Sequence, residues 1–211
     1  MIKYVSFDLD ATLVNDKFDK LIWHEEVPKL YAKQHKIGVA EAKQFVYSQY
    51  YRALDIERVS QWTSITYWFK RLKLGNWQKL LSDMKKHIFV FDDTIPTLDY
   101  LKKKYKLIIT SNSEKKFFEL KLEAEELSKY FDHVFSAPTS FNRTRKDKEM
   151  FRAILKKLKI KPSEIVHIGD DRQLDYVMPT ELGIKSFLLD RTKKAKGKNV
   201  IHSLLELKRI L

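Results

Sequence analysis

The sequence predicts an α/β fold, a Rossmann-like parallel sheet of about five strands with a helical unit inserted behind the first strand. Two observations carry this prediction. Short apolar runs alternate with helical patterns, which is typical of a parallel sheet covered by helices on both faces. Behind the first run, some seventy residues show helical periodicity and little strand character. A chain of 211 residues has room for one core domain and a smaller insertion.

The first strand begins almost at the first residue and ends in two acids. Tyr4, Val5 and Phe7 are aromatic or β-branched, as in a short buried strand, and Asp8 and Asp10 follow at its carboxyl end. Ligands of open parallel sheets bind at this edge, where the loops diverge. Two neighbouring carboxylates repel each other, so their presence would be explained by a bound cation or by a joint role in proton transfer. The alternative is an Asx-type turn with no chemistry.

The inserted unit reads as four helices. Their apolar positions recur at helical spacing, and Asn76 after Gly75 is expected to cap the last of them. We therefore predict a helical domain over residues 15–88 and a core domain over residues 1–14 and 89–211. All four tryptophans lie in the helical domain, where we expect most of them to form its core. The helices are expected near residues 21–31, 40–54, 60–72 and 76–86.

The rest of the chain returns to alternating elements. Gly183 is expected to end a helix as its C-cap, and a last helix from about Ser203 closes the chain. The expected strands are residues 107–110, 133–136, 165–168 and 186–189, and the expected helices are residues 97–104, 114–129, 148–158 and 171–182.

Further polar groups follow the later strands. Ser111 and Asn112 offer a hydroxyl and an amide to phosphoryl oxygens, unless they only cap the next helix. Gly169 allows a sharp turn into Asp170 and Asp171, which brings Asp170 to the edge where Asp8 is expected. Asp175 lies four residues after Asp171, and a basic loop spans residues 143–148, for which the alternative is a solvated run of charge.

Composition limits the remaining choices. The chain has no cysteine, which excludes disulfides, thiolate metal sites and cysteine nucleophiles. No run of 18 apolar residues and no leader pattern is visible, so we expect a cytoplasmic protein with no membrane partner. The net charge of +13 comes from lysines spread over amphipathic segments, and we expect a solvated surface. Such a lysine-rich, cysteine-free composition is also found in heat-adapted proteins, so we expect thermostability.

Taken together, these motifs resemble those of the haloacid dehalogenase superfamily of phosphohydrolases. The segment Asp8-Leu9-Asp10-Ala11-Thr12 is similar to the first motif of that family, and Ser111 to the second. The basic loop at 145–148 is similar to the third, and Gly169-Asp170-Asp171 with Asp175 to the fourth. The resemblance covers residues 1–14 and 90–190, and the helical insertion resembles the family's α-helical cap of the first type.

The resemblance implies a role for each residue. Asp8 would be the nucleophile that forms an aspartyl phosphate, and Asp10 the acid and base that serves the leaving group and the water. Mg²⁺ would lie among Asp8, Asp10 and Asp170. The phosphate would be bound by Ser111, Asn112 and an active-site cation. The cation is expected to be Lys146, which would also make it a catalytic residue, with Arg145 and Lys148 as alternates.

The sequence departs from the family motifs in two places. Ala11 stands where the family usually has glycine, and the usual Lys-Pro pair of the third motif is missing.

Other residues are expected to support the site. Thr12 is expected to tie the turn after Asp10, and Asp171 or Asp175 to orient metal-bound water or the lysine. His167 is expected to be a core histidine with satisfied hydrogen bonds.

The leading interpretation is a Mg²⁺-dependent phosphatase that acts on a small phosphorylated metabolite, as a monomer or a homodimer. A phosphomutase is an alternative of the same fold. A dehalogenase is disfavoured because Asp10 supplies the acid that a phosphate ester's leaving group needs. A catalytically degenerate, basic nucleic-acid-binding protein is an alternative of another class. A receiver-type phosphoacceptor domain would not need the helical insertion.

Overall fold

The computed structural model describes residues 1–211, apart from the side chain of Glu125. Over these residues the strands form one six-stranded sheet in the order β3-β2-β1-β4-β5-β6, and every neighbouring pair is parallel. The predicted α/β class is therefore confirmed. The edge strand β6 was not predicted, because two residues are too few to show a pattern. The strands are β1 (Tyr4–Phe7), β2 (Lys106–Ser111), β3 (His133–Ser136), β4 (Ile165–Gly169), β5 (Lys185–Leu189) and β6 (Val200–Ile201).

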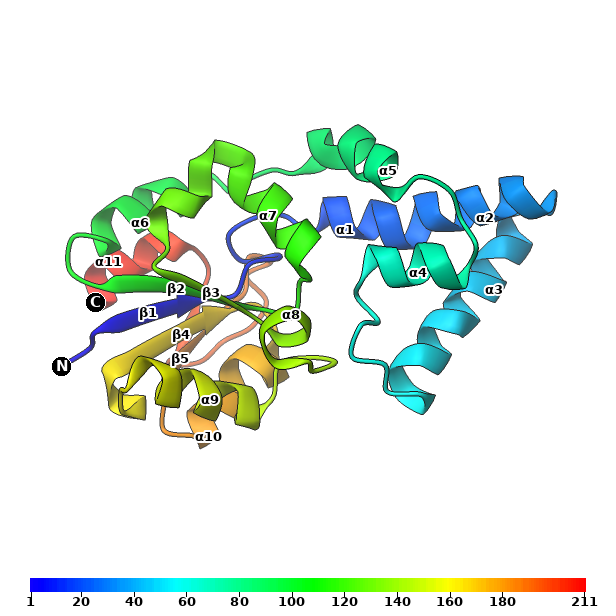
Figure 1. The fold of residues 1–211 in the computed structure, drawn as a ribbon. Coiled ribbons are helices and arrows are strands. Elements are labelled where there is room, and N and C mark those ends of the chain that lie inside the picture. The colour runs from blue at the N-terminus through cyan, green and yellow to red at the C-terminus, as the bar shows by residue number, and fades with distance from the viewer.

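Helices cover both faces of the sheet (Figure 1). Side chains alternate along each strand, so Leu107 and Ile109 join one buried cluster while Ile108 joins another. The first cluster packs beneath α6, α7 and α11, and the second against α9. The helices of this part are α6 (Thr94–Leu101), α7 (Lys115–Glu123), α8 (Ala137–Phe141), α9 (Lys148–Leu158), α10 (Met178–Glu181) and α11 (Leu207–Ile210).

Several helices of this part are less regular than their sequence pattern suggests. The helix expected over residues 114–129 changes after α7 into a 3₁₀ segment, Ala124–Tyr130. The helix expected over residues 171–182 begins as a π-helical segment, Arg172–Val177, before α10. Gly183 follows with a φ of +81°, as expected for a C-cap glycine. Short 3₁₀ turns are formed by Pro162–Glu164 and Leu204–Glu206.

The inserted helices form a group of their own beside the sheet (Figure 1). Their buried side chains make a third cluster around Trp68, which Phe117 of α7 also joins. Asn76 caps α5 as predicted, because its Oδ1 accepts a hydrogen bond from the Lys79 backbone at 2.9 Å. The helices are α1 (Lys17–Leu21), α2 (Val27–His35), α3 (Val39–Tyr51), α4 (Ile65–Arg71) and α5 (Trp77–Met84), with π-helical turns Ile22–Glu26 and Arg52–Ile56 and a 3₁₀ turn Lys85–His87.

The chain enters and leaves this helical group through two adjacent segments. Val14 and Val90 form an antiparallel bridge, and the Asn15 amide donates to the Phe89 carbonyl at 2.9 Å. The predicted boundaries at residues 14 and 89 fall on these segments. The division into two domains itself stays a prediction.

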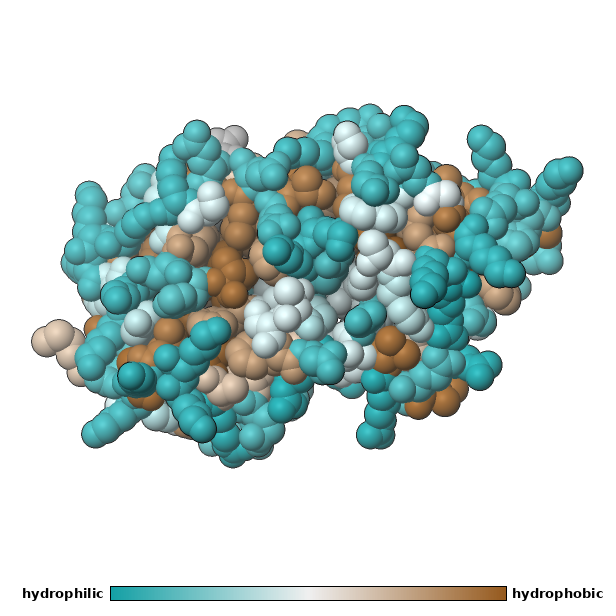
Figure 2. Space-filling model, in the orientation of Figure 1, coloured by the Kyte–Doolittle hydropathy of each residue, from teal (hydrophilic) through white to brown (hydrophobic). Residues whose placement is uncertain are grey.

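Hydrophilic residues cover most of the face in Figure 2, and hydrophobic residues show in smaller separate areas. This agrees with a net charge of +13 carried mostly by solvated lysines. Among the described residues, no helix combines the length and the apolar character that a membrane span requires.

Candidate active site

Asp8, Ser111 and Asp170 lie where the neighbouring strands β1, β2 and β4 end. The register aligns Phe7 with Ile109 on one side and with Ile168 on the other, so these strands stop at nearly the same level. The Asp8 amide donates to the Ile168 carbonyl at 2.8 Å, which fixes the first acid at the end of β1. The chain runs from β1 outward to β2 and later returns to β4 on the other side, and ligands of α/β sheets bind at such a switch point.

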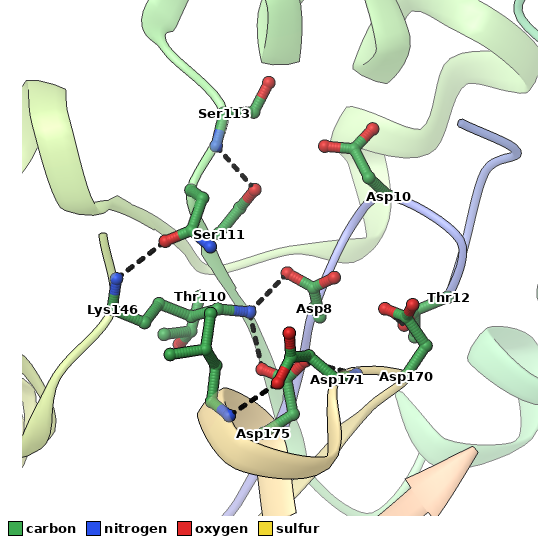
Figure 3. A network of polar contacts seen from close by, with 12 residues as sticks. Asp8, Asp10, Thr12, Thr110, Ser111, Ser113, Lys146, Asp170, Asp171 and Asp175 are labelled. Atoms are coloured by element: carbon green, nitrogen blue, oxygen red, sulfur yellow. Dashed lines mark hydrogen bonds and ion pairs between the residues drawn. The ribbon is translucent and has the colours of Figure 1, made fainter. Parts of the chain in front are cut away.

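A buried ion-pair cluster forms the centre of the site (Figure 3). The Lys146 ammonium donates to Asp8 Oδ1 at 2.7 Å and to Asp175 Oδ1 at 2.5 Å. The lysine side chain is only 2% exposed, and Asp175 is fully buried. Lys146 is therefore the cation of this cluster, whereas Arg145 and Lys148 are exposed outside it.

Asp175 is fixed by several partners in addition to Lys146. His167 Nε2 lies 3.0 Å from Asp175 Oδ1, and the Asp171 amide donates to Oδ2 at 3.1 Å. His167 Nδ1 in turn lies 2.9 Å from Ser6 Oγ, so both ring nitrogens have partners, as expected of a core histidine. Burial lowers the pKa of His167, so the ring is neutral at pH 7. Asp175 is thus a rigid support for the lysine.

Gly169 is required here for a different reason from the one predicted. Its φ is not in the left-handed region, so the turn itself does not demand glycine. A Cβ on residue 169 would instead lie 2.3 Å from Asp175 Cγ. Glycine is needed because the Asp175 side chain packs directly on this backbone.

The loop that carries Lys146 is held by β2 and by the helical group. Asn112 Oδ1 accepts from the Lys146 amide at 2.6 Å, and Trp62 Nε1 donates to the Thr144 carbonyl at 2.6 Å. Asn112 therefore positions the lysine loop with its oxygen. Ser111 is buried at the end of β2, and its Oγ accepts from the Ser113 amide at 3.0 Å.

The electrostatics of the cluster favour a bound cation. Burial raises the pKa of Asp8 well above its ordinary value, Lys146 opposes this, and nearby Asp175, Asp170 and Asp10 raise it further. Although burial favours the neutral amine, Asp175 and Asp8 raise the pKa of Lys146, so it remains an ammonium. Lys146 thus compensates only part of the negative charge that gathers here.

The donor set fits a hard divalent cation. Carboxylate oxygens of Asp8, Asp170 and Asp175 all lie within 4.8 Å of one another. Oxygen ligands of this kind suit Mg²⁺. Asp175 already binds Lys146 and His167, so Asp8 and Asp170 are the better placed of the three to hold a metal.

Asp10 lies apart from that cluster (Figure 3). It is bound by a residue that the sequence did not point to, Lys121 of α7, whose Nζ lies 2.5 Å from Asp10 Oδ1 and 2.6 Å from Asp19 Oδ2. Lys121 follows the buried Phe117 by four residues, so it occupies the apolar face of its helix. A charged residue on that face is the one signal that could have revealed it.

The remaining predicted residues have supporting contacts. Thr12 is fully buried, and its hydroxyl lies 3.5 Å from Asp170 Oδ1, the long limit of a hydrogen bond. Asp171 caps the segment after β4, because its Oδ1 accepts from the Gln173 and Leu174 amides at 2.8 Å each. Its carboxylate is engaged there rather than with the lysine.

Ala11 adopts a φ of +56°, the left-handed conformation that favours glycine. The alanine is therefore accommodated, as expected, but with backbone strain next to Asp10.

Comparisons with known proteins bear on the family and the fold of this chain. The family model of haloacid dehalogenase-like hydrolases matches residues 2–183. A GMP/IMP nucleotidase of Escherichia coli K12, YrfG, is 26% identical over 171 residues, which are 81% of this chain and 75% of that protein. The crystal structure of a HAD phosphatase from Thermococcus onnurineus superposes with a TM-score of 0.80 at 26% identity and covers 99% of this chain and 97% of its own. A HAD hydrolase from Bacillus subtilis, YfnB, whose structure was determined with bound magnesium, shares the fold, with a TM-score of 0.65 at 18% identity over 100% of this chain and 98% of its own.

Proposed function

This chain belongs to the haloacid dehalogenase-like hydrolase family, and we propose that it is a Mg²⁺-dependent phosphatase that hydrolyses small phosphomonoesters through a phosphorylated Asp8. The observation that carries the proposal is the buried contact of the Lys146 ammonium with both Asp8 and Asp175. A lysine held in this way neutralises part of the charge that arises when an anionic phosphate approaches an anionic nucleophile.

The proposed reaction transfers the phosphoryl group twice, first to Asp8 and then to water. An Asp8 oxygen attacks phosphorus in line with the leaving oxygen, forming one phosphorus–oxygen bond as the other breaks. Asp10 gives its proton to the departing alkoxide and then takes a proton from the water that attacks the acyl phosphate. Inorganic phosphate leaves and Asp8 is regenerated. Lys146, Ser111 and Asn112 bind the phosphoryl oxygens during both transfers.

Mg²⁺ would be held by Asp8 and Asp170, with the Asp10 backbone carbonyl as a third ligand, and would screen the negative charge of the phosphate. Thr12 lies beside Asp170, and its hydroxyl would help to orient that ligand. Asp175 would hold Lys146 in place, and Asp171 would hold Asp175 through its backbone amide, so neither side chain needs to touch the substrate.

We propose nucleoside monophosphates as the first substrates to test, because the E. coli relative is a GMP/IMP nucleotidase. An aromatic cavity of about 240 Å³ in the helical group supports this choice. Aromatic walls stack well on a flat base. Two buried oxygens at this cavity, Tyr50 Oη and Thr63 Oγ1, lack a hydrogen-bond partner among the described residues and could serve base edges. The cavity is lined by Trp23, His24, Tyr50, Trp62, Thr63 and Trp68.

Contacts connect this cavity to the site on two sides. Trp62 binds the carbonyl of Thr144, two residues before Lys146. The Trp23 ring stacks on Phe117 with centroids 5.4 Å apart, and Phe117 in turn adjoins Lys121, the partner of Asp10. We therefore propose that residues 15–88 form a cap that holds the leaving group of the substrate over the core.

The function is tested by phosphate release from p-nitrophenyl phosphate with and without Mg²⁺, by the wild type and by Asp8→Asn. We expect turnover that requires the metal and falls at least about 10³-fold in the variant. Absence of turnover with any divalent metal, or an undiminished rate in the variant, would refute the proposal. Salt-sensitive binding of nucleic acid by an inactive protein would favour the binding interpretation instead.

The substrate class is tested by a panel of nucleoside monophosphates, sugar phosphates and phosphoglycolate. We expect Trp23→Leu to raise KM for nucleoside monophosphates and to leave KM for ribose 5-phosphate little changed. Trp77→Leu is the matched control, since Trp77 lies in the same helical group outside this cavity. An equal effect of Trp23→Leu on both substrates would argue against a base-binding cavity.

A further inference from the structure

A buried lysine beside the proposed acid has no role in the chemistry described so far. The side chain of Lys121 is 0% exposed. Burying an ammonium is costly unless it is paired and hydrogen-bonded, so its partners explain its presence. Although burial opposes it, Asp10 and Asp19 raise the pKa of Lys121, and the side chain is a cation at neutral pH.

The partners of Lys121 come from separate parts of the chain. Asp10 follows β1, Asp19 belongs to α1 of the helical group, and Ser113 follows β2, with its Oγ 3.3 Å from the ammonium. The rings of Phe18 and Phe117 lie 5.9 and 5.7 Å from Nζ and limit its movement. The ammonium is thus fixed at the junction between the helical group and the sheet.

The contact with Lys121 holds one oxygen of the Asp10 carboxylate. Its side chain is 27% exposed, and the next residue, Ala11, lies in a left-handed turn outside β1. The hydrogen bond from Lys121 is made to Oδ1, so Oδ2 is the oxygen of Asp10 that would carry the transferred proton. A proton donor must lie within hydrogen-bond reach of the leaving oxygen, and a displacement of about 1 Å can cost on the order of 10²-fold in rate.

We propose that Lys121 is the positioning residue for Asp10, and that Asp19 ties this contact to the first helix of the cap. The inference rests on the proposed phosphatase function. Lys121 does not touch the phosphate. It holds the Asp10 carboxyl group at the place where its Oδ2 proton passes to the leaving oxygen as the ester bond to phosphorus breaks.

The test compares two leaving groups. Nitrophenolate departs as a stabilised anion and needs little help from an acid, whereas the alkoxide of a nucleoside monophosphate needs a proton. The measured quantity is kcat/KM for GMP divided by kcat/KM for p-nitrophenyl phosphate, because kcat/KM includes the step that transfers the phosphoryl group to Asp8. A merely structural role of Lys121 would lower both values together.

We expect Lys121→Met to lower this ratio at least about 10-fold. Lys121→Arg keeps the positive charge and protects the fold, but its larger planar group cannot take the same place, so we expect a ratio about 3-fold below that of the wild type. Lys115→Met, at an exposed position of the same helix, is the matched control and should leave the ratio unchanged. Thermal unfolding of each variant identifies those that fold.

A ratio within about 2-fold of the wild type in either folded Lys121 variant would overturn the inference. That result leaves the phosphatase function intact, because the wild type would still hydrolyse both substrates. Failure of the wild type to hydrolyse p-nitrophenyl phosphate with any divalent metal is a different outcome, which refutes the proposed function and with it the role of Lys121.

Discussion

Replacement of Lys146 by methionine tests the charge balance at the centre of the site. The methionine fills most of the same space but removes the ammonium that lies 2.7 Å from Asp8 and 2.5 Å from Asp175. Breaking a buried pair by removing one partner costs about 3–5 kcal/mol, because the remaining charge is left uncompensated. Protonation of Asp8 would relieve part of this cost, so we expect a loss of about 3 kcal/mol in the free energy of unfolding.

Urea unfolding and phosphatase activity measure the two consequences. A loss of about 3 kcal/mol corresponds to a fall in Tm of roughly 6–12 °C for a chain of this size. We expect phosphatase activity to fall by at least about 10²-fold, because Asp8 and the phosphate would meet without a cation between them.

Lys148→Met provides the control. Lys148 is two residues away, has a side chain that is 45% exposed, and pairs with Glu181 at the surface. We expect its replacement to change stability by less than about 0.5 kcal/mol and to leave activity intact. Equal unfolding midpoints for the two variants, or a Lys146→Met protein with normal activity, would contradict the assigned role of Lys146.

Three further predictions concern the backbone and the tertiary contacts around the site. Ala11→Gly should raise the free energy of unfolding by about 1 kcal/mol in urea denaturation, because it relieves a residue at φ +56°, and an unchanged midpoint would show that this turn is not strained. Gly169→Ala should displace Asp175, destabilise by about 1–3 kcal/mol and lower kcat/KM, whereas Gly75→Ala, with open space around it, should not. For Asp93, burial favours the protonated form, but Arg191 and Ser203 hold its pKa below the ordinary 3.8. The contribution of the ion pair to stability is thus present above about pH 4 and is lost as the pH falls through the lower folded pKa. The free energy of unfolding of the wild type should therefore exceed that of Asp93→Asn at pH 7, and this difference should shrink as the pH falls below about 4. A difference of equal size at pH 7 and in strong acid would contradict the ion pair.

The parts of the fold that follow from local pattern could be predicted. Apolar runs such as residues 107–110 are short and bounded by polar residues, so their strand character is visible in the sequence. The parallel order then brings their carboxyl ends together, and this is why Asp8 and Asp170 could be expected side by side. β6 could not be predicted, because its two residues, Val200 and Ile201, are too few to show an alternating pattern. They adopt the strand conformation by pairing with β5.

Contacts that depend on burial were harder to predict. The spacing of the motif did not decide which of Arg145, Lys146 and Lys148 is the active-site cation. In the structure only Lys146 of these three is buried, and it lies against Asp8. In the sequence, Lys121 resembles the solvent-exposed lysines of an amphipathic helix. Its pairing with Asp10 spans 111 positions along the chain and becomes visible only when α7 is placed beside β1.

The proposed mechanism requires that Asp8 becomes phosphorylated during turnover. The most direct measurement is an acid quench of the wild type during turnover of a phosphomonoester with Mg²⁺, followed by mass spectrometry of the peptide that carries Asp8. We expect the mass of one phosphoryl group on Asp8, removed by hydroxylamine as for an acyl phosphate, and no such mass in Asp8→Asn. Turnover with a phosphoryl group on another residue, or turnover by the Asp8→Asn protein at the wild-type rate, would refute the assignment of Asp8 as the nucleophile.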